Sequence, residues 1–430
     1  MTLAAGCALD RAALEGHQTR TLQALMRALL ASNQFYAAKL RAARVETIPR
    51  SLREFAGSVP FTFKAELIDD QTRNPPFGSN LTYPAEAYSR FHQTSGTTGK
   101  PMRWLDTPES WDWVVECWTR IYQSAGIGRH DRIFFPFSFG PFLGFWGAFD
   151  TAARMGCLSI PGGGMRSTAR LRTILDNEVT ALCSTPTYAM HLAEVAAEEG
   201  IDLTAAKVRT ITVAGEPGGS IPATRSHIEL LWPGARVVDH HGMTEIGPVS
   251  YECPQRRCVL HVMEMAFFPE VIDPNTLERV GPGGSGELVL TNLGRVGSPI
   301  LRYRTGDIVR RAQAERCECG SEEMALEGGI LGRCDDMVVV RGVNLYPSAV
   351  EQVVRSSGGV AEFRVEIYNQ RSLTELSIQI EPAAGVDAPA LSHRVATALQ
   401  YAFGLRVSVC SVPAGTLPRF EAKSKRWIYR

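Results

Sequence analysis

The sequence predicts an α/β protein, in which a large amino-terminal domain of layered helices and strands carries a β-rich subdomain and precedes a small, mobile α+β domain. Short apolar runs alternate with helical patterns through the middle of the chain, as in parallel sheets that are buried on both faces. Beyond about Gly281, glycine-rich turns and strands follow one another without helices. At 430 residues the chain exceeds what one hydrophobic core supports, so two or more domains are expected.

The amino-terminal segment is expected to be helical, because Leu22, Leu25, Met26 and Leu29 recur at the spacing of one helix face. Farther along, four apolar runs predict buried strands, with helical patterns between them: Ile133–Phe137, Cys157–Ile160, Ala181–Ser184 and Val208–Val213.

Parallel sheets bind their ligands beyond the carboxyl ends of the strands. The chemistry is therefore expected in the turns at Ser184–Pro186, at Ala214–Gly219 and after Val238.

The β-rich subdomain is expected to contain strands at Glu287–Thr291 and Leu301–Asp307. The turn Gly332–Asp336 then interrupts the pattern, and the rest of the chain indicates two central strands, Phe363–Tyr368 and Glu375–Ile380, flanked by helices and short strands. These observations predict one domain over residues 1–332 and a second over residues 333–430. A domain as small as the second is expected to move against the first.

Composition excludes several classes of partner. Forty-five basic residues balance forty-five acidic ones, so no overall field favours nucleic acid or an anionic membrane. The longest apolar stretch, Phe134–Phe149, contains two prolines and three glycines, which argues against a membrane-spanning helix. Because the first ten residues do not resemble a secretory signal, we expect a cytoplasmic protein. In such a reducing compartment, the clustered thiols among its ten cysteines suggest metal binding rather than disulfides.

The segment Thr94–Lys100 is a candidate phosphate-binding loop. It consists of Thr94, Ser95, Gly96, Thr97, Thr98, Gly99 and Lys100. Backbone N–H groups, hydroxyls and one ammonium can together surround an oxyanion. The segment is not a Walker A loop, because only two residues separate its glycines and Pro101 stands where that motif has a metal-binding hydroxyl.

Six motifs in order resemble those of the adenylate-forming acyl-CoA ligases. They are Thr94–Lys100, Gly242–Glu245, Tyr303–Asp307, Gly332–Asp336, Arg341–Pro347 and Pro418–Lys423. The short chain, the long amino-terminal lead-in and the Cys317-Glu318-Cys319-Gly320 element are most similar to the phenylacetate–CoA ligase branch.

The resemblance implies that ATP converts a carboxylic acid into an acyl adenylate, which CoA then attacks. Charge builds up on phosphate oxygens in the first step, so positioned donors and Mg²⁺ give most of the catalysis. By this likeness Thr94–Lys100 holds the β- and γ-phosphates, Thr244 contacts phosphate, Glu245 helps to hold Mg²⁺, and Asp307 binds the ribose hydroxyls. The remaining expected nucleotide contacts are Ala214, Gly215, Glu216 and Pro217 beside adenine, His241 where relatives usually have an aromatic residue, and Arg333.

Two residues are expected to connect chemistry with domain motion. Lys423 matches the mobile lysine of the family, and the spacing from Pro418 favours it over Lys425. Asp335 falls at the family's hinge. One orientation of the small domain would deliver Lys423 for adenylation, and another would bring Arg341–Asn344 to the site for thioester formation.

The acyl pocket is expected behind an aromatic wall, Phe135–Phe145 with Trp146, which includes Phe142 and Phe145. His240 and Gly242 are expected to complete the lining. Aromatic and glycine-rich walls suit a flat aryl acid better than a long acyl chain.

A structural zinc site is a separate hypothesis. Cys253, His261, Cys317 and Cys319 supply the four soft ligands of a tetrahedral zinc, with Cys258 as a substitute. The Cys-x-Cys-Gly element is similar to that of related ligases with such a zinc.

Our leading hypothesis is an aryl-acid:CoA ligase that forms AMP and pyrophosphate and acts as a homodimer, as relatives in this branch suggest. An alternative keeps adenylation but transfers the acyl group to the pantetheine of an acyl carrier protein or to an amine. A third alternative, a binding protein without catalysis, is disfavoured because Lys100, Thr244, Glu245, Asp307 and Lys423 are all present.

Overall fold

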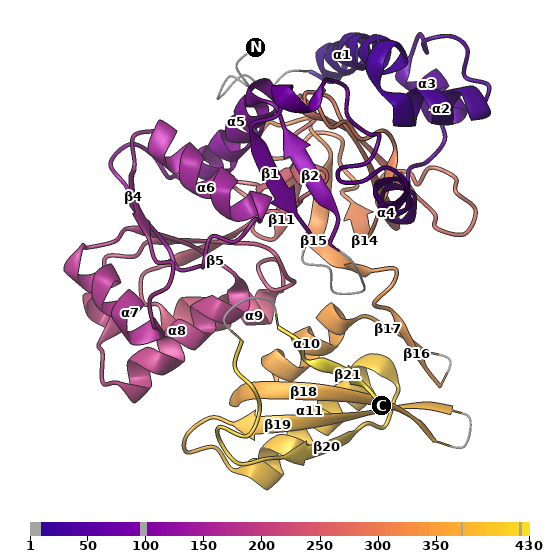
Figure 1. Cartoon of the computed structure of the whole chain (residues 1–430). Helices are drawn as coiled ribbons and strands as arrows, with labels where there is room; N and C mark the ends of the chain where they lie inside the picture. Colours follow the sequence, from indigo (N-terminus) through magenta and orange to yellow (C-terminus); the bar gives the residue numbers. More distant parts are fainter. Residues whose placement is uncertain (1–9, 95–100, 342, 371–372, 421–423) are drawn as a thin grey trace.

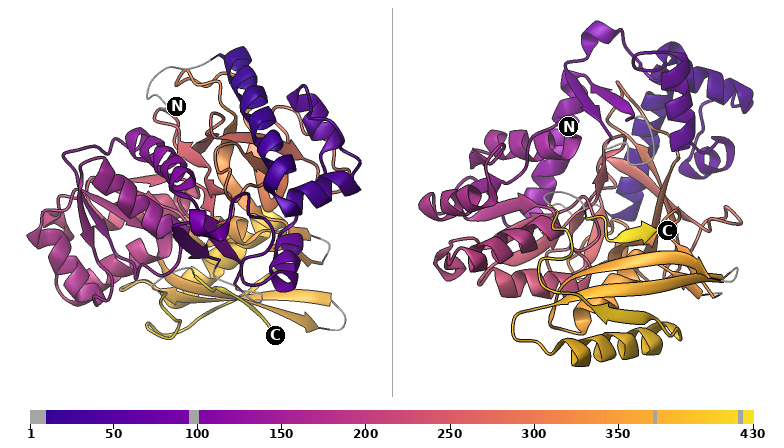
Figure 2. Two further views of the ribbon diagram at one scale, coloured as in Figure 1. Left: turned by 45° about the horizontal axis from the view of Figure 1, so that its top comes forward. Right: turned by 60° about the horizontal axis from the view of Figure 1, so that its bottom comes forward.

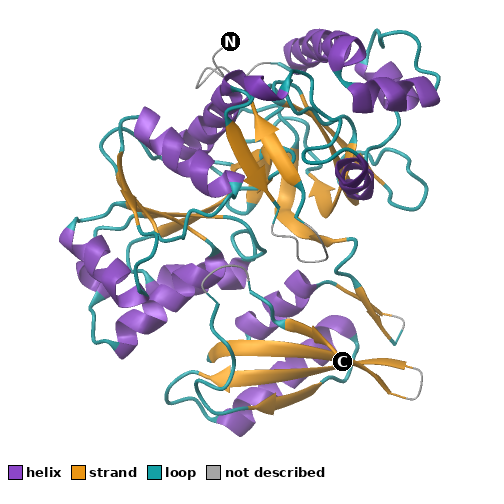
Figure 3. Cartoon of the chain, viewed as in Figure 1, coloured by secondary structure: helices purple, strands orange, loops and turns teal. Residues whose placement is uncertain are grey.

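The computed structural model describes residues 10–94, 101–341, 343–370, 373–420 and 424–430 (Figure 1). It is built from two sheets in the large amino-terminal part and a third sheet in the carboxyl-terminal part (Figure 3).

Four helices open the described chain: α1 (Arg11–Ser32), α2 (Gln34–Ala42), α3 (Leu52–Ser58) and α4 (Lys64–Arg73). Helix α1 begins after Asp10, whose carboxylate accepts a hydrogen bond from the backbone N–H of Ala13. The expected apolar face of α1 is buried and packs with Phe55, with Phe268 of the second sheet and with Leu301, which precedes β14. The helical prediction for this segment is confirmed.

The first sheet is entirely parallel, in the order β4-β3-β5-β6-β7. Its strands are β3 (Arg132–Phe135), β4 (Leu158–Pro161), β5 (Ala181–Ser184), β6 (Thr210–Val213) and β7 (Arg236–Asp239). Helices α5 (Pro108–Ser124) and α6 (Leu143–Arg154) pack on one face. Helices α7 (Ser167–Asp176), α8 (Pro186–Glu198) and α9 (Pro222–Leu231) pack on the other. The expected layered α/β architecture is present, and all four expected strands occur within two residues of their predicted bounds.

The second sheet is antiparallel, in the order β10-β11-β15-β14-β13-β12. Its strands are β10 (Ser250–Glu252), β11 (Val259–Val262), β12 (Phe267–Ile272), β13 (Ser285–Asn292), β14 (Tyr303–Arg311) and β15 (Ala325–Arg333). The β-rich part therefore begins at Ser250, earlier than the sequence indicated. The first three strands are buried at every position, so they lack the alternation of apolar and polar residues that reveals a half-buried strand.

Two short strand pairs flank expected functional segments: β1 (Arg90–Gln93) with β2 (Arg103–Asp106), and β8 (Gly242–Met243) with β9 (Gly247–Pro248). Single turns of 3-10 helix occur at Ala85–Ala87 and Leu203–Ala205.

The carboxyl-terminal part has its own core. It opens with the hairpin of β16 (Val338–Val340) and β17 (Val343–Leu345) and continues through α10 (Pro347–Ser356), β18 (Val360–Gln370), β19 (Leu373–Pro382), α11 (Ala388–Phe403), β20 (Ser408–Ser411) and β21 (Trp427–Tyr429). The sheet order is β20-β19-β18-β21. Figure 2 shows this part below the amino-terminal part in both views, and α10 packs against α9. Among the described helices none is long and apolar enough to span a membrane.

The carboxyl-terminal core gives a prediction about stability. Leu399 of α11 is fully buried, whereas Tyr401, two residues later, is 95% exposed. Leu399→Ala leaves a cavity and should lower the free energy of unfolding of this part by about 2–5 kcal/mol. Chemical denaturation with Tyr401→Ala as the matched control checks this. Equal stability of the two variants would contradict the packing of α11.

Candidate active site

The base of the candidate phosphate loop is closed by the β1–β2 pair. The backbone N–H of Thr94 donates to the carbonyl of Met102 at 2.9 Å, and the N–H of Met102 donates to Thr94 Oγ1 at 3.0 Å. The rest of the predicted loop, Ser95, Gly96, Thr97, Thr98, Gly99 and Lys100, lies outside the described residues. Its contact with phosphate remains a prediction.

The turn that carries Thr244 and Glu245 connects β8 to β9. Gly242 is required there, because an added Cβ would lie 2.9 Å from the carbonyl oxygen of Gly247. Glu245 is buried and accepts a hydrogen bond from the hydroxyl of Tyr303 at 2.7 Å. The ammonium of Lys64 lies 3.7 Å from the same carboxylate oxygen. A buried carboxylate next to a cation is a suitable ligand for a hard metal ion such as Mg²⁺.

A buried ion pair holds this turn in place. The guanidinium of Arg295 binds both carboxylate oxygens of Asp106 at 2.6 Å and donates to the carbonyl of Thr244 at 2.7 Å. Both charged side chains are completely buried. Asp106 ends β2, so the ion pair connects the strand after the phosphate loop to the turn of Thr244.

The expected ribose-binding residue lies beside the expected adenine residue. Asp307 is buried on β14, and its Oδ2 lies 2.9 Å from Nε2 of His241 without hydrogen-bond geometry. Among the described residues this oxygen has no hydrogen-bond partner. A buried carboxylate oxygen in that state is an acceptor for a ligand hydroxyl.

Arg333 joins this group to the expected hinge. Its guanidinium donates to Oδ1 of Asp307 at 3.0 Å and to both oxygens of Asp335 at 2.8 and 3.0 Å. Burial opposes the charge of Arg333, but the hydrogen bonds to Asp335 and the nearby carboxylates outweigh it and raise the pKa. Asp335 is exposed in the connection between β15 and β16. Its action as a hinge remains a prediction.

The turn Ala214–Pro217 follows β6, as expected for a nucleotide-binding turn. Gly215 has a φ of 93°, a left-handed conformation that favours glycine. The carboxylate of Glu216, however, accepts hydrogen bonds from two backbone N–H groups, those of Thr187 and Ser424. The predicted contact of Ala214, Gly215, Glu216 and Pro217 with adenine thus remains a prediction, while the side chain of Glu216 links α8 to the carboxyl-terminal part.

The predicted aromatic wall forms a connected cluster at the end of β3 and the start of α6. Phe137 and Phe145 stack with ring centroids 4.0 Å apart, and Phe142 meets Phe145 edge-on at 5.6 Å. Phe135 is fully buried in the core and reaches the cluster only through its neighbours, Phe137 at 5.8 Å among them. Phe142 and Phe145 are therefore better placed than Phe135 to contact a ligand.

His240, the other expected lining residue of the acyl pocket, packs against α5. Its ring is buried edge-on to Trp118 at 4.5 Å, and among the described residues its Nδ1 has no hydrogen-bond partner. Burial and the neighbouring His241 lower the pKa of His240 to about 3, so the imidazole is neutral at physiological pH.

The four expected zinc ligands converge. Ligand atoms of Cys253, His261, Cys317 and Cys319 all lie within 4.8 Å of one another. The sulfurs of Cys253 and Cys317 are 3.7 Å apart, and the sulfur of Cys319 lies 3.5 Å from Nε2 of His261. Bond lengths of about 2.3 Å to sulfur and about 2.0 Å to nitrogen in a tetrahedron give separations of about 3.8 and 3.5 Å. The residues therefore fit zinc.

Surrounding contacts orient these ligands. Nδ1 of His261 lies 3.3 Å from the carbonyl oxygen of Glu323, and the backbone N–H of Arg256 donates to the sulfur of Cys253 at 3.3 Å. Cys258, the suggested substitute, is not part of the cluster.

Three residues at the site were missed by the sequence analysis as functional candidates: Lys64, Asp106 and Arg295. Lys64 contacts Glu245 and Arg295 contacts Thr244 from distant parts of the chain, Asp106 reaches this turn only through Arg295, and no local motif surrounds any of the three. Tyr303 was included in a motif, but its hydrogen bond to Glu245 was not expected.

The four clustered ligands give a prediction about the zinc content of the protein. We expect purified protein to contain about one zinc per chain, because four ligands at tetrahedral spacing bind it tightly. Cys319→Ser should lose most of this zinc and lower the thermal unfolding midpoint, whereas Cys410→Ser, on exposed β20, should change neither. Elemental analysis with calorimetry measures both quantities. Wild-type protein without stoichiometric zinc would refute the site.

Comparison with known proteins identifies the family. The family model described as AMP-binding enzyme matches residues 85–294, and the one described as AMP-binding enzyme C-terminal domain matches residues 342–430. The phenylacetate-coenzyme A ligase of Thermus thermophilus is 31% identical over 98% of this chain and 97% of its own. That of Escherichia coli is 29% identical over 96% of this chain and 94% of its own.

Solved structures agree. The 2-hydroxyisobutyryl-CoA ligase in its postadenylation state, in complex with 2-HIB-AMP, has a TM-score of 0.91 at 28% identity, covering 98% of this chain and 91% of that one. The same enzyme with 2-HIB-AMP and CoA in the thioesterification state gives a TM-score of 0.74 at the same coverage. The chain therefore belongs to the adenylate-forming acyl-CoA ligases and is a relative of the phenylacetate-CoA ligases.

Proposed function

We propose that this protein uses ATP to activate an aromatic carboxylic acid and then transfers the acyl group to CoA, forming aryl-CoA, AMP and pyrophosphate. One observation carries the proposal. The adjacent residues His240 and His241 face different surroundings: His240 meets Trp118 of α5, and His241 meets the proposed ribose-binding Asp307. A carboxylic acid on the first side and a nucleotide on the second would meet at these two residues, where adenylation requires them to meet.

The reaction has two balanced steps. In the first, an oxygen of the acid attacks the α-phosphorus of ATP, the bond to the bridging oxygen breaks, and pyrophosphate leaves. In the second, the sulfur of CoA attacks the acyl carbon, AMP leaves with the oxygen that came from the acid, and the thiol proton is released to solvent. Mg²⁺, when bound, offsets negative charge on the phosphates, and Glu245 would help to hold it.

The aromatic cluster supports an aryl substrate. The stacked rings of Phe137 and Phe145 and the edge of Phe142 form apolar surface that suits another ring. The relatives in Thermus thermophilus and Escherichia coli are named for phenylacetate. A small branched acid is the alternative substrate, since the similar solved structures hold 2-HIB-AMP.

CoA is favoured as acceptor because the relatives that cover nearly the whole chain are CoA ligases. An acyl carrier protein or an amine remains the alternative acceptor. We further propose that the carboxyl-terminal part alternates between two positions. The 2-hydroxyisobutyryl-CoA ligase supports this proposal, because its structures in the postadenylation and thioesterification states both match this chain, with TM-scores of 0.91 and 0.74.

The substrate proposal predicts the outcome of an exchange assay. Labelled pyrophosphate should enter ATP at least about tenfold faster with phenylacetate or benzoate than with 2-hydroxyisobutyrate or a long-chain acid. A tenfold difference corresponds to about 1.4 kcal/mol of binding free energy, which the contact of a substrate ring with an aromatic pocket can supply. Thioester formation with CoA, compared with a carrier protein, then identifies the acceptor. Exchange with none of these acids would refute the proposed function, and exchange with 2-hydroxyisobutyrate alone would refute the aryl specificity.

The proposed role of Lys423 predicts a selective defect. Lys423→Ala should slow pyrophosphate exchange by about 10²–10³-fold, because one charged donor at developing phosphate charge is typically worth that much. Thioester formation from supplied acyl adenylate should change far less. Lys425→Ala, whose side chain is exposed, is the matched control and should leave both rates unchanged. Equal losses in both steps would count against Lys423 as the adenylation lysine.

A further inference from the structure

The chain on both sides of the proposed catalytic lysine is docked on α8 and on the turn after β6. Before it, Nε of Arg419 lies 2.9 Å from a carboxylate oxygen of Glu194. After it, the backbone N–H of Ser424 donates to Glu216 at 2.7 Å, and Nη1 of Arg426 donates to Thr187 Oγ1 at 3.4 Å. Residues 421–423 lie outside the described chain, but the segments on both sides of them are held by the amino-terminal part.

The carboxylate of Glu216 connects α8 to the backbone of Ser424. One of its carboxylate oxygens accepts from the N–H of Thr187 at 2.8 Å, and the other accepts from the N–H of Ser424. Thr187 lies in the first turn of α8, where the helix dipole favours a negative charge and the N–H groups lack partners within the helix. The helix therefore fixes Glu216 in place, and Glu216 fixes the backbone of Ser424.

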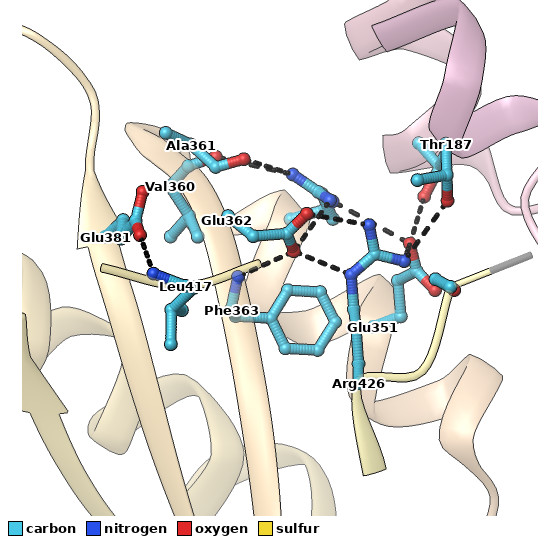
Figure 4. A network of polar contacts seen from close by, with 12 residues as sticks. Thr187, Glu351, Val360, Ala361, Glu362, Phe363, Glu381, Leu417 and Arg426 are labelled. Atoms are coloured by element: carbon cyan, nitrogen blue, oxygen red, sulfur yellow. Dashed lines mark hydrogen bonds and ion pairs between the residues drawn. The ribbon is translucent and has the colours of Figure 1, made fainter. Parts of the chain in front are cut away.

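The hydrogen bonds of Arg426 within the carboxyl-terminal part are shorter than those that this part makes with α9. Arg426 forms a buried bidentate ion pair with Glu362 at 2.6 and 3.0 Å (Figure 4). The contacts that this region makes with α9, between Thr224 and Glu351 and between Ala223 and Gln352, are longer, at 3.3 and 3.1 Å. A crevice of about 10 Å³, lined by Thr187, Glu194, Arg355, Arg419 and Arg426 among others, remains at this boundary and has room for about one water molecule. These features suit docking that can be reversed.

We propose that Glu216 is a positioning residue for adenylation, which docks the backbone directly after Lys423 against the first turn of α8. The proposal rests on the proposed function. Ser424 must leave Glu216 when the carboxyl-terminal part moves, so Glu216 acts on adenylation and not on thioester formation. This role differs from nucleotide binding, the function that the sequence suggested for the turn Ala214–Pro217.

Half-reactions test the proposal. Glu216→Ala should lower the maximal rate of pyrophosphate exchange about tenfold more than the rate of thioester formation from supplied acyl adenylate, with the KM for ATP changed less than about twofold. A tenfold change in rate corresponds to about 1.4 kcal/mol, which is a typical free energy for the loss of a hydrogen bond to a charged acceptor. Glu216→Gln keeps one acceptor oxygen and should give an intermediate rate. Glu198→Ala, at the exposed end of α8, is the matched control.

Limited digestion with trypsin measures docking without activity. The segment 419–426 contains four cleavage sites, and Glu216→Ala should increase their cleavage rate severalfold while Glu198→Ala does not. An unchanged exchange rate, equal loss in both half-reactions, or a rise only in the KM for ATP would overturn the proposal. If no acid supports pyrophosphate exchange by the wild-type protein, the proposed function fails. The docking role of Glu216 is tested independently, because an unchanged cleavage rate in Glu216→Ala overturns it.

Discussion

The buried ion pair between Asp106 and Arg295 is the interaction on which the candidate site depends. Two charges without solvent contact are costly unless each finds a partner of good geometry, and removing one leaves the other uncompensated. Here the guanidinium binds both oxygens of the carboxylate and uses a remaining donor for the carbonyl of Thr244. The arrangement therefore fixes the turn of Thr244 and Glu245 relative to the strand that leaves the phosphate loop. Two segments separated by more than a hundred residues are thereby joined through Arg295.

The two proposed halves of the reaction make different demands on the structure. Adenylation needs donors around phosphate oxygens, and the thioester step needs access for a long thiol substrate. In this chain the groups of the amino-terminal part are held by side-chain contacts, such as the buried hydrogen bond of Tyr303 with Glu245 and the partly buried one of Arg333 with Asp307. The carboxyl-terminal part instead meets α8 and α9 through a few polar contacts around a small crevice. A proposed nucleotide site held by such contacts, next to a domain that we propose docks reversibly, is consistent with two steps that share one site.

Much of the fold could be predicted from sequence because its signals are local. The strands of the parallel sheet are short apolar runs between turns, and α1 shows one apolar face. The strands from β10 to β12 could not be recognised, because buried polar residues such as Glu252, His261 and Glu270 interrupt them, so neither an apolar run nor an alternation marks them. Among site residues, the cysteines and His261 could be predicted because their side chains are typical zinc ligands. The contacts of Arg295 with Thr244 and of Glu216 with Ser424 could not be foreseen, because they join distant segments whose meeting depends on the whole fold.

The central claim is that the carboxylate of the acid attacks the α-phosphorus of ATP, and oxygen labelling tests it most directly. The substrate acid is enriched with ¹⁸O in its carboxylate and turned over with ATP and CoA, and the products are analysed by mass spectrometry. The account predicts one labelled oxygen in AMP for each thioester formed, and none in pyrophosphate, because AMP leaves with the oxygen that bridged the acyl carbon and phosphorus. Label in pyrophosphate or inorganic phosphate, or thioester formed together with unlabelled AMP, would contradict an acyl adenylate as the intermediate.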